Sequence, residues 1–387
     1  MAATERAGSR VNLLAAALAL PGLVLPALDA HAEAAPDQTT VGFKYLSYRD
    51  WQPYDASQPA RSGDRIHVHS PSLYWSAPVG KTMSVTGSAV YDSVTGASPY
   101  YHNTLSGASR KGYIDEQRKA AEVAVSWYGE HDVLTVGASN SSEHDYHSNA
   151  ISAGWRVNTD GNNRTWEIGA SAASDRIDAV TAGVTGKHKQ SYGALVGVTQ
   201  VLTPDDLVQL NVTYSAGRGY FSDPYKNEYG IDVRPDKRDQ VAVLLKYNHY
   251  FEDWGAALRT SVRHYRDTFG VRSATVTAEW AQPIPWRMAV TPSVRYTTQS
   301  AASFYYDPPF PSGSGLQPYY SADTRLSAFG AFTYGLKLEK AIGRSSKVDL
   351  KVEQYEQRGA WRLEGHGSTG LLPFYARFWQ VGWSTSF

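Results

Sequence analysis

Apolar and polar side chains alternate along most of this chain after residue 40. Residues 207–216 read LVQLNVTYSA, in which every second residue from Val208 onward is apolar and the residues between are Gln, Asn, Thr and Ser. Successive side chains of a β-strand point to opposite faces, so each such stretch has one apolar face and one polar face. No stretch after residue 40 fits a helical period better than this alternation. The chain is therefore predicted to be all-β.

Sixteen candidate strands, an even number, follow from the alternation and from the turn residues that separate the strands. They are residues 40–49, 63–76, 80–92, 118–128, 131–144, 146–157, 163–174, 187–201, 205–219, 237–250, 253–267, 270–282, 285–300, 324–341, 345–357 and 373–387. Even-numbered strands are followed by short turns, such as 158–163 and 203–206, whereas most odd-numbered strands are followed by long segments, such as 220–236 and 301–323. Short turns at one end and long loops at the other are typical of outer-membrane barrels.

Basic residues on the polar face decide which face points outward. In the strand 285–300, Arg287 and Arg295 lie on the face opposite to Val290 and Val294. A packed protein core would not accommodate these arginines, whereas a watery lumen would, and closing the sheet satisfies every backbone hydrogen bond. We predict one transmembrane antiparallel β-barrel of about sixteen strands over residues 33–387, in the bacterial outer membrane, with both termini in the periplasm.

The first 32 residues have the pattern of a secretory signal peptide. Arg6 and Arg10 precede the apolar residues 11–25, and Ala30-His31-Ala32 offers a small-x-small cleavage site. Pro21 and Gly22 lie within the apolar stretch and Pro26 directly follows it, which argues against an uncleaved anchor helix. Cleavage after Ala32 is predicted.

Aromatic residues support the membrane assignment. Eight of the 11 tryptophans fall at strand ends that the parity of the connections assigns to the periplasm, where a belt of tryptophan is expected. They are Trp75, Trp127, Trp155, Trp166, Trp254, Trp280, Trp286 and Trp383. The chain ends in an amphipathic strand closed by Phe387, which resembles the signal that the barrel assembly machinery recognises. We therefore expect outer-membrane lipid and lipopolysaccharide as surroundings and the assembly machinery as a partner.

Composition excludes several other functions. The chain contains no Cys, which excludes disulfides, zinc-thiolate sites, iron–sulfur clusters and covalently attached c-type haem. It has 37 basic and 37 acidic residues, so no net charge indicates a nucleic-acid partner. We predict no cofactor and no nucleic-acid binding.

Five stretches resemble an uncharacterised family of Gram-negative proteins, domain of unknown function 3570, whose members are predicted outer-membrane barrels. They are Tyr91–Pro99, Tyr220–Lys226, Arg234–Arg238, Pro292–Tyr305 and Tyr320–Leu326. The resemblance implies the fold and the compartment. It also implies the company of flavin-transfer and thioredoxin-like genes, but no catalytic residues.

The predicted lumen wall is not uniform in charge. Strands three to nine place mostly Ser, Thr and Gly inward, whereas strands ten to fifteen place inward Lys246, Arg259, Arg263, Arg287, Arg295, Lys337 and Lys351. These cations are partly offset by Glu279, Glu339, Asp349 and Glu353. A cationic half-wall would concentrate anions in a pore. The alternative is that the cations pair with the carboxylates and only solvate or fill the lumen.

Two predicted extracellular loops share a motif of aromatic residues, Asp and Pro. In residues 220–230 the motif contains Tyr220, Asp223, Pro224 and Tyr225, and in residues 303–310 it contains Asp307 and Pro308. Such rigid aromatic turns could stack on sugar rings or narrow the mouth of the barrel. The alternative is a cap of loops that pack on one another and stabilise the rim.

Histidines are the remaining candidates for chemistry. His67 and His69 would lie on one strand face, and residues 143–147 crowd acidic residues and histidines into one turn, yet neither has further ligands at a recognisable spacing. No metal site is predicted. His102 with Asn103, and His264 near Asp267, are the rim candidates for catalysis, but such proximities are expected by chance in a chain with 11 His.

The pattern favours a pore for small polar solutes, with a preference for anions. A second hypothesis is a non-transporting scaffold or sheath that holds a periplasmic partner such as a redox protein, which only the implied gene company supports. An outer-membrane enzyme is a third hypothesis, and we predict that the chain is not one.

Overall fold

Sixteen antiparallel strands close into one barrel in the computed structural model, which describes residues 34–53, 63–97, 113–227, 232–307 and 317–387. The first strand, β1 (Thr40–Gln52), pairs with both β2 (Gly63–Val79) and the last strand, β18 (Phe374–Ser386). The others are β3 (Met83–Ala97), β4 (Tyr113–Tyr128), β5 (Asp132–Ser142), β6 (Tyr146–Thr159), β7 (Arg164–Ile177), β8 (Lys187–Val201), β9 (Asp206–Gly219), β11 (Lys237–Phe251), β12 (Ala256–Asp267), β13 (Arg272–Ile284), β14 (Met288–Gln299), β16 (Phe329–Ile342) and β17 (Ser346–Arg358). The predicted fold class is confirmed.

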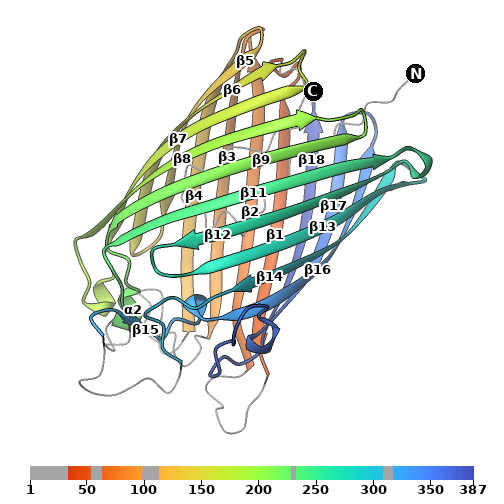
Figure 1. Cartoon of the computed structure of the whole chain (residues 1–387). Coiled ribbons are helices and arrows are strands. Elements are labelled where there is room, and N and C mark those ends of the chain that lie inside the picture. Colours follow the sequence, from red (N-terminus) through yellow and green to blue (C-terminus); the bar gives the residue numbers. More distant parts are fainter. Residues whose placement is uncertain (1–33, 54–62, 98–112, 228–231, 308–316) are drawn as a thin grey trace.

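The two ends of the barrel differ, as the connection lengths predict. The two ends of the described chain meet at the short-turn end, where Thr39 and Phe387 exchange two backbone hydrogen bonds of 3.0 and 2.9 Å. The opposite end carries the long connections, which include the short helix α2 (Pro224–Asn227) and a small pairing of β10 (Asp232–Val233) with β15 (Tyr320–Ser321) (Figure 1). The predicted cleavage site lies outside the described residues.

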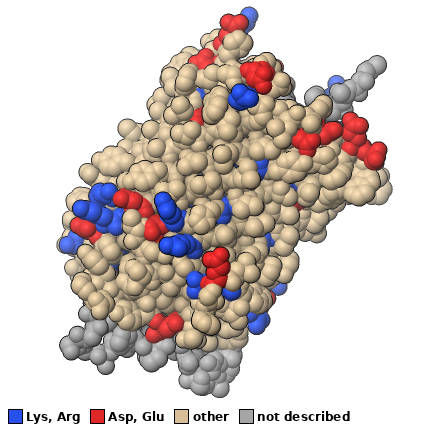
Figure 2. Space-filling model, in the orientation of Figure 1, with Lys and Arg blue, Asp and Glu red and all other residues tan. Residues whose placement is uncertain are grey.

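The apolar face of the strands points outward. On β9, the side chains of Leu210, Val212 and Tyr214 are 39, 41 and 44% exposed, although they are apolar or aromatic. In a closed barrel these side chains meet the surroundings, and the alternate residues Asn211 and Thr213 face the lumen. Figure 2 shows the result as a broad surface nearly free of charge, with charged residues gathered toward the two ends.

Tryptophans mark the short-turn end of the outer surface, as predicted. Trp127, Trp155, Trp166 and Trp383 are exposed on the strands near this end, and Trp254 and Trp286 are exposed in its turns; Trp254 also packs on Trp280. The indole ring prefers the boundary between membrane and water. This belt therefore defines one edge of the membrane-spanning band.

The strand bounds agree with the prediction to within a few residues, with three larger differences. β3 ends at Ala97 rather than at residue 92. β4 begins at Tyr113 rather than at residue 118. β16 begins at Phe329 rather than at residue 324, because Thr324–Leu326 form a 3-10 turn capped by the Asp323 side chain, which accepts a hydrogen bond from the Arg325 backbone N–H. Among the described residues, no helix is long and apolar enough to cross a membrane.

Candidate functional site

Three of the predicted lumen arginines lie together on one part of the wall. Residues that face each other across an antiparallel strand pair point to the same side of the sheet. Arg259 and Arg263 on β12, and Arg295 on β14, alternate with the exposed outer residues Val262 and Val294. Their side chains therefore face the lumen, and we call these three residues the arginine patch.

The register brings the arginine patch into a compact triangle. Thr277 on β13 lies opposite Arg295 on one side and opposite Ser261 on the other, and Ser261 is midway between Arg259 and Arg263. The three backbone positions therefore lie within two strands and four residues of one another, or roughly 12–13 Å apart. Among the described residues, none of the three arginines forms a salt bridge; the Arg263 guanidinium instead lies 5.3 Å from the centre of the Tyr265 ring.

Two of the predicted lumen lysines, Lys337 and Lys351, form salt bridges with glutamates. Lys337 Nζ and Lys347 Nζ each lie 2.5 Å from Glu339 Oε1, and Lys351 Nζ lies 2.9 Å from Glu353 Oε2. These pairs fit the alternative in which cations and carboxylates form a structural network. Lys246 lies opposite Ser261 and Gln209 on the lumen face, beside the arginine patch.

Arg287 does not lie on the lumen wall, contrary to the prediction that β14 would include it. It belongs to the turn before β14, where Trp286 and Arg287 have positive φ angles of 63° and 59°. Its guanidinium donates a hydrogen bond to the Gly343 carbonyl in the neighbouring β16–β17 turn. Arg287 thus connects two turns at the rim.

The wall formed by β3–β9 carries small and balanced groups. The predicted inward residues Ser139, Ser152 and Gly193 have the register of the lumen face. The charges found there are largely paired: Arg118 with Asp92 at 2.6 Å, and Lys189 with Asp175 at 3.0 Å. Three lumen arginines without a salt bridge among the described residues therefore lie on β12 and β14, and one of them, Arg259, lies directly opposite Glu279 on β13.

A cluster of charged side chains fastens the two long loops at the other end of the barrel. Lys226 Nζ from residues 220–236 lies 3.2 Å from Asp323 Oδ1 in residues 300–328, and Arg234 donates to Asp323 Oδ2 at 2.8 Å. Arg325 forms a further salt bridge with Asp323. Arg234 Nε also donates a hydrogen bond to Asp232 Oδ2 at 2.9 Å. We call Asp223, Lys226, Asp232, Arg234, Asp323 and Arg325 the loop ion cluster. Its three acids and three bases cancel in net charge.

Burial shifts the protonation of this cluster in opposite directions. Burial lowers the pKa of Lys226, against the attraction of Asp323. Burial alone would raise the pKa of Asp323, but Arg325, Lys226 and Arg234 together hold it well below its usual range. Burial raises the pKa of Asp232, and Arg234 offsets this only in part. Asp323 is therefore the ionised centre of the cluster.

Aromatic residues of the same loops pack on one another. Phe269, in the β12–β13 connection, contacts Phe221 and Phe304 edge to face, with ring centres 5.9 and 5.0 Å apart. Phe269 and Phe304 are buried together with Val271 and Leu326. This arrangement fits the cap of self-packed loops, because the described rings bury one another.

The individual motif residues take separate places in this cap. Tyr220 packs beside Ala179 and Ala182, and Asp223 accepts a charged hydrogen bond from Arg325. Pro224 begins α2, and Asp307 Oδ2 accepts the Thr369 N–H of the β17–β18 loop at 3.0 Å. The Tyr225 side chain and Pro308 lie outside the described residues.

Residue patterns alone did not single out Asp232, Arg234, Asp323 or Arg325. A signal was nevertheless present, because Tyr220–Lys226, Arg234–Arg238 and Tyr320–Leu326 were among the stretches that carried the family resemblance. The structure brings these three stretches together in the loop ion cluster, to which Asp232 adds a carboxylate from outside the three stretches.

The histidine candidates are dispersed. His67 and His69 lie on the outer face, where His69 Nδ1 bonds the Tyr45 hydroxyl at 2.8 Å. His264 points outward and Asp267 points to the lumen, so the two do not face each other. His102 and Asn103 lie outside the described residues. Within the described part of the chain, no group of three or more His, Cys, Asp or Glu side chains could hold a metal ion.

A closed antiparallel barrel with an apolar outer surface, a polar lumen and long loops at one end defines an outer-membrane β-barrel, and it places the chain in the bacterial outer membrane. A bacterial polysaccharide outer membrane secretin shares the fold, with a TM-score of 0.50 and 10% identity over 90% of this chain and 98% of that one. CdiB from Acinetobacter baumannii (TM-score 0.49, 8% identity, 90% of this chain and 60% of that chain) and OccK1 (OpdK) from Pseudomonas aeruginosa (0.45, 10%, 90% and 98%) are more distant. At such identities the likeness concerns the fold alone.

The family follows from the sequence itself. The model described as "Protein of unknown function (DUF3570)" matches residues 101–186 and 181–378, and the chain belongs to this family. The chain has no significant match among curated proteins.

Proposed function

We propose that the barrel is a passive pore for small polar solutes and that the arginine patch makes it prefer anions. The observation that carries this proposal is the charge state of the patch: three lumen-facing arginines without a salt bridge among the described residues. Sixteen strands are enough to enclose an aqueous channel. A fixed excess of positive charge on such a wall raises the local concentration of anions.

The paired lysines sharpen this proposal. Lys337, Lys347 and Lys351 are held by Glu339 and Glu353, so their fields are largely cancelled at the distance of a passing solute. Among the described residues the arginine patch forms no salt bridge: Arg259 lies opposite Glu279, whereas Arg263 and Arg295 face threonines on β13. Guanidinium groups bind carboxylate and phosphate oxygens in a bidentate manner. We propose that small carboxylates or phosphate esters are the favoured solutes and that the barrel lets them pass without changing them chemically.

Planar bilayer recordings test the proposal. The purified full-length mature chain should show discrete conductance steps, and the reversal potential in a KCl gradient should shift toward the anion. Replacing Arg263 and Arg295 with Ser should lower the anion-to-cation permeability ratio by about twofold or more, because local enrichment by fixed charge is typically tenfold or greater. Arg287→Ser is the matched control for each single variant, Arg263→Ser and Arg295→Ser, since it also removes one positive charge but from a turn outside the wall.

Two outcomes would contradict the proposal. Silence at all voltages would exclude a pore and favour the scaffold hypothesis. Equal loss of selectivity in the Arg287→Ser control and in the single variants Arg263→Ser and Arg295→Ser would show that total charge, and not the patch, sets the preference.

A further inference from the structure

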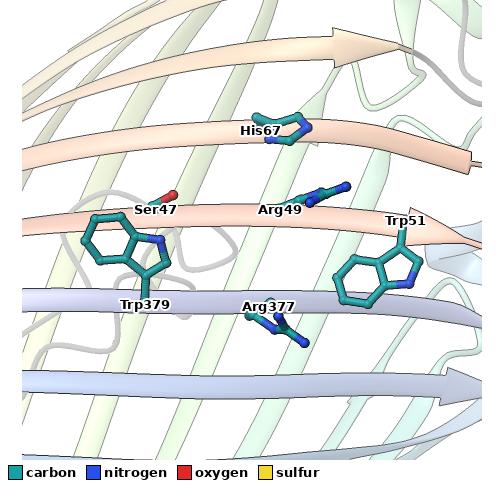
Figure 3. A pocket seen from close by; sticks show the side chains of 6 residues that line it. All are labelled: Ser47, Arg49, Trp51, His67, Arg377 and Trp379. Carbon is teal, nitrogen blue, oxygen red and sulfur yellow. The ribbon is translucent and has the colours of Figure 1, made fainter.

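A hollow lies on the outer surface of the barrel where the last strand closes onto the first. It has a volume of about 540 Å³ and is lined by six residues of β1, β2 and β18: Ser47, Arg49, Trp51, His67, Arg377 and Trp379. Figure 3 shows the two tryptophan rings at opposite ends of the hollow, with His67, Arg49 and Arg377 between them. We call this the seam pocket.

Strand register places the three basic residues of the seam pocket in one row. Arg49 on β1 lies directly opposite Arg377 on β18 and, on its other side, directly opposite His67 on β2. Neighbouring strands are roughly 5 Å apart, and like charges placed directly opposite each other are unfavourable. The six lining residues include no carboxylate. Each guanidinium carries five N–H donors, so the row can offer several donors to one anion.

The seam pocket lies at the edge of the membrane-spanning band that is nearer the long loops. On the same face and closer to the short-turn end, Phe43 on β1, Leu73 on β2 and Val381 on β18 are exposed apolar residues. Arg49 and Arg377 come after these residues in the direction of the long loops, near the ends of their strands. This is the depth at which lipid head groups of the outer leaflet meet a barrel.

Aromatic contacts hold the pocket in shape. The Trp51 ring stacks on Tyr375 at 5.7 Å, and the Arg377 guanidinium lies 5.8 Å from the centre of the Trp51 ring. Arg377 Nε donates to Gln354 Oε1 at 3.1 Å, which fixes one side of the guanidinium plane. Flat aromatic rings flanking a fixed guanidinium suit a ligand that carries both a sugar ring and a phosphate.

We propose that the seam pocket binds the phosphorylated sugar head group of an outer-leaflet glycolipid, the chemical class to which lipopolysaccharide belongs. Arg49 and Arg377 bind the phosphate, His67 adds a third donor, and Trp51 and Trp379 pack against the sugar. This proposal does not depend on whether the lumen conducts.

Native mass spectrometry of the detergent-purified full-length mature chain, titrated with the phosphorylated glycolipid, tests it. The Arg49→Gln/Arg377→Gln variant should retain the lipid about tenfold more weakly, the loss expected for a charge-assisted hydrogen bond. Arg164→Gln is the matched control: Arg164 also lies on the outer face and donates through Nε to a cross-strand glutamine, Gln200, but at the short-turn end. Binding by this control should equal that of the wild type.

Two further binding measurements identify the source of the phosphate. A dephosphorylated glycolipid should bind about tenfold more weakly, and inorganic phosphate should not displace the intact lipid. Displacement by inorganic phosphate would overturn the lipid assignment in favour of a free phosphate site. Equal lipid retention by wild type and the double variant would overturn the site itself. If the double variant fails to fold, Arg377→Lys, which keeps the charge but loses the guanidinium fork, should still weaken binding, and unchanged binding would count against the proposal.

Discussion

Lys226 Nζ lies 3.2 Å from Asp323 Oδ1, and these two side chains, from loops 97 residues apart, are 1 and 0% exposed. Both charges are removed from water, so each depends on the other and on Arg234 and Arg325 for compensation. A buried pair of this kind contributes little net free energy but makes the loss of one partner costly. The loops are therefore fixed to each other in one arrangement at the mouth of the barrel.

Asp323→Asn should detach the two loops. It removes the carboxylate that compensates Lys226 and Arg234, which would leave buried charges at a cost of about 3–5 kcal/mol. Hydrogen exchange of residues 220–227 and 317–328 should become much faster, whereas exchange in the barrel strands should not change.

Asp232→Asn is the matched control within the same cluster. Burial already raises the pKa of Asp232, so the fold tolerates its neutral form, and an asparagine oxygen can still accept hydrogen bonds. We expect a clearly smaller increase in exchange than for Asp323→Asn. A larger increase would contradict the assignment of Asp323 as the ionised centre.

The docked loops should resist mild acid. The pKa of Asp323 in the fold is held below its unfolded value near 3.9, so its stabilising contribution is complete above about pH 4 and is lost as pH falls through the lower folded pKa. Asp232 acts in the opposite sense, since its raised pKa stabilises the docked state at low pH and loses this effect as pH rises. The loops should therefore remain docked at pH 5.

Spin labels can measure this response, because the chain has no native cysteine. Labels on cysteines introduced at Pro235 and Tyr319, which flank the β10–β15 pairing, should keep a short, narrow distance distribution from pH 7 to about pH 4 and broaden only below it. Broadening already at pH 5 would mean that a carboxylate with an ordinary or raised pKa holds the loops.

Gly330→Ala should disturb the rim of the barrel. An added Cβ would lie 2.0 Å from the Trp361 carbonyl oxygen, to which the Tyr296 hydroxyl donates a hydrogen bond. Backbone must move to relieve this clash, and such overpacking costs about 1–3 kcal/mol. A lower midpoint in urea unfolding would show it, and Gly42→Ala, whose Cβ would meet nothing closer than 3.5 Å, should leave the midpoint nearly unchanged.

The barrel could be predicted from sequence because its rules are local. A period of two in residues such as Leu210, Asn211 and Val212 reports the two faces directly, and closure leaves only one of them for the lipid. The parity of short and long connections then orients the barrel. These features need no knowledge of contacts between distant segments.

The charge states of the site could not be predicted in this way. Alternation placed Arg295 correctly, but it could not show that the β13–β14 turn extends to Arg287, because Trp286 and Arg287 adopt a left-handed conformation that neither residue type favours. It also could not show that Lys351 forms a salt bridge whereas Arg263 forms none among the described residues, or that Lys226 lies beside Asp323. These facts depend on side-chain geometry and on contacts between loops.

One measurement tests the central claim most directly: the collision rates of spin labels at Val212 and Thr213 in lipid bilayers. These neighbours on β9 lie on opposite faces, so the account predicts that the Val212 label collides mainly with lipid-soluble oxygen and the Thr213 label mainly with a water-soluble nickel chelate. A Thr213 label shielded from both reagents would mean a filled, dry interior, and the water-filled lumen on which the proposed pore depends would have to be abandoned.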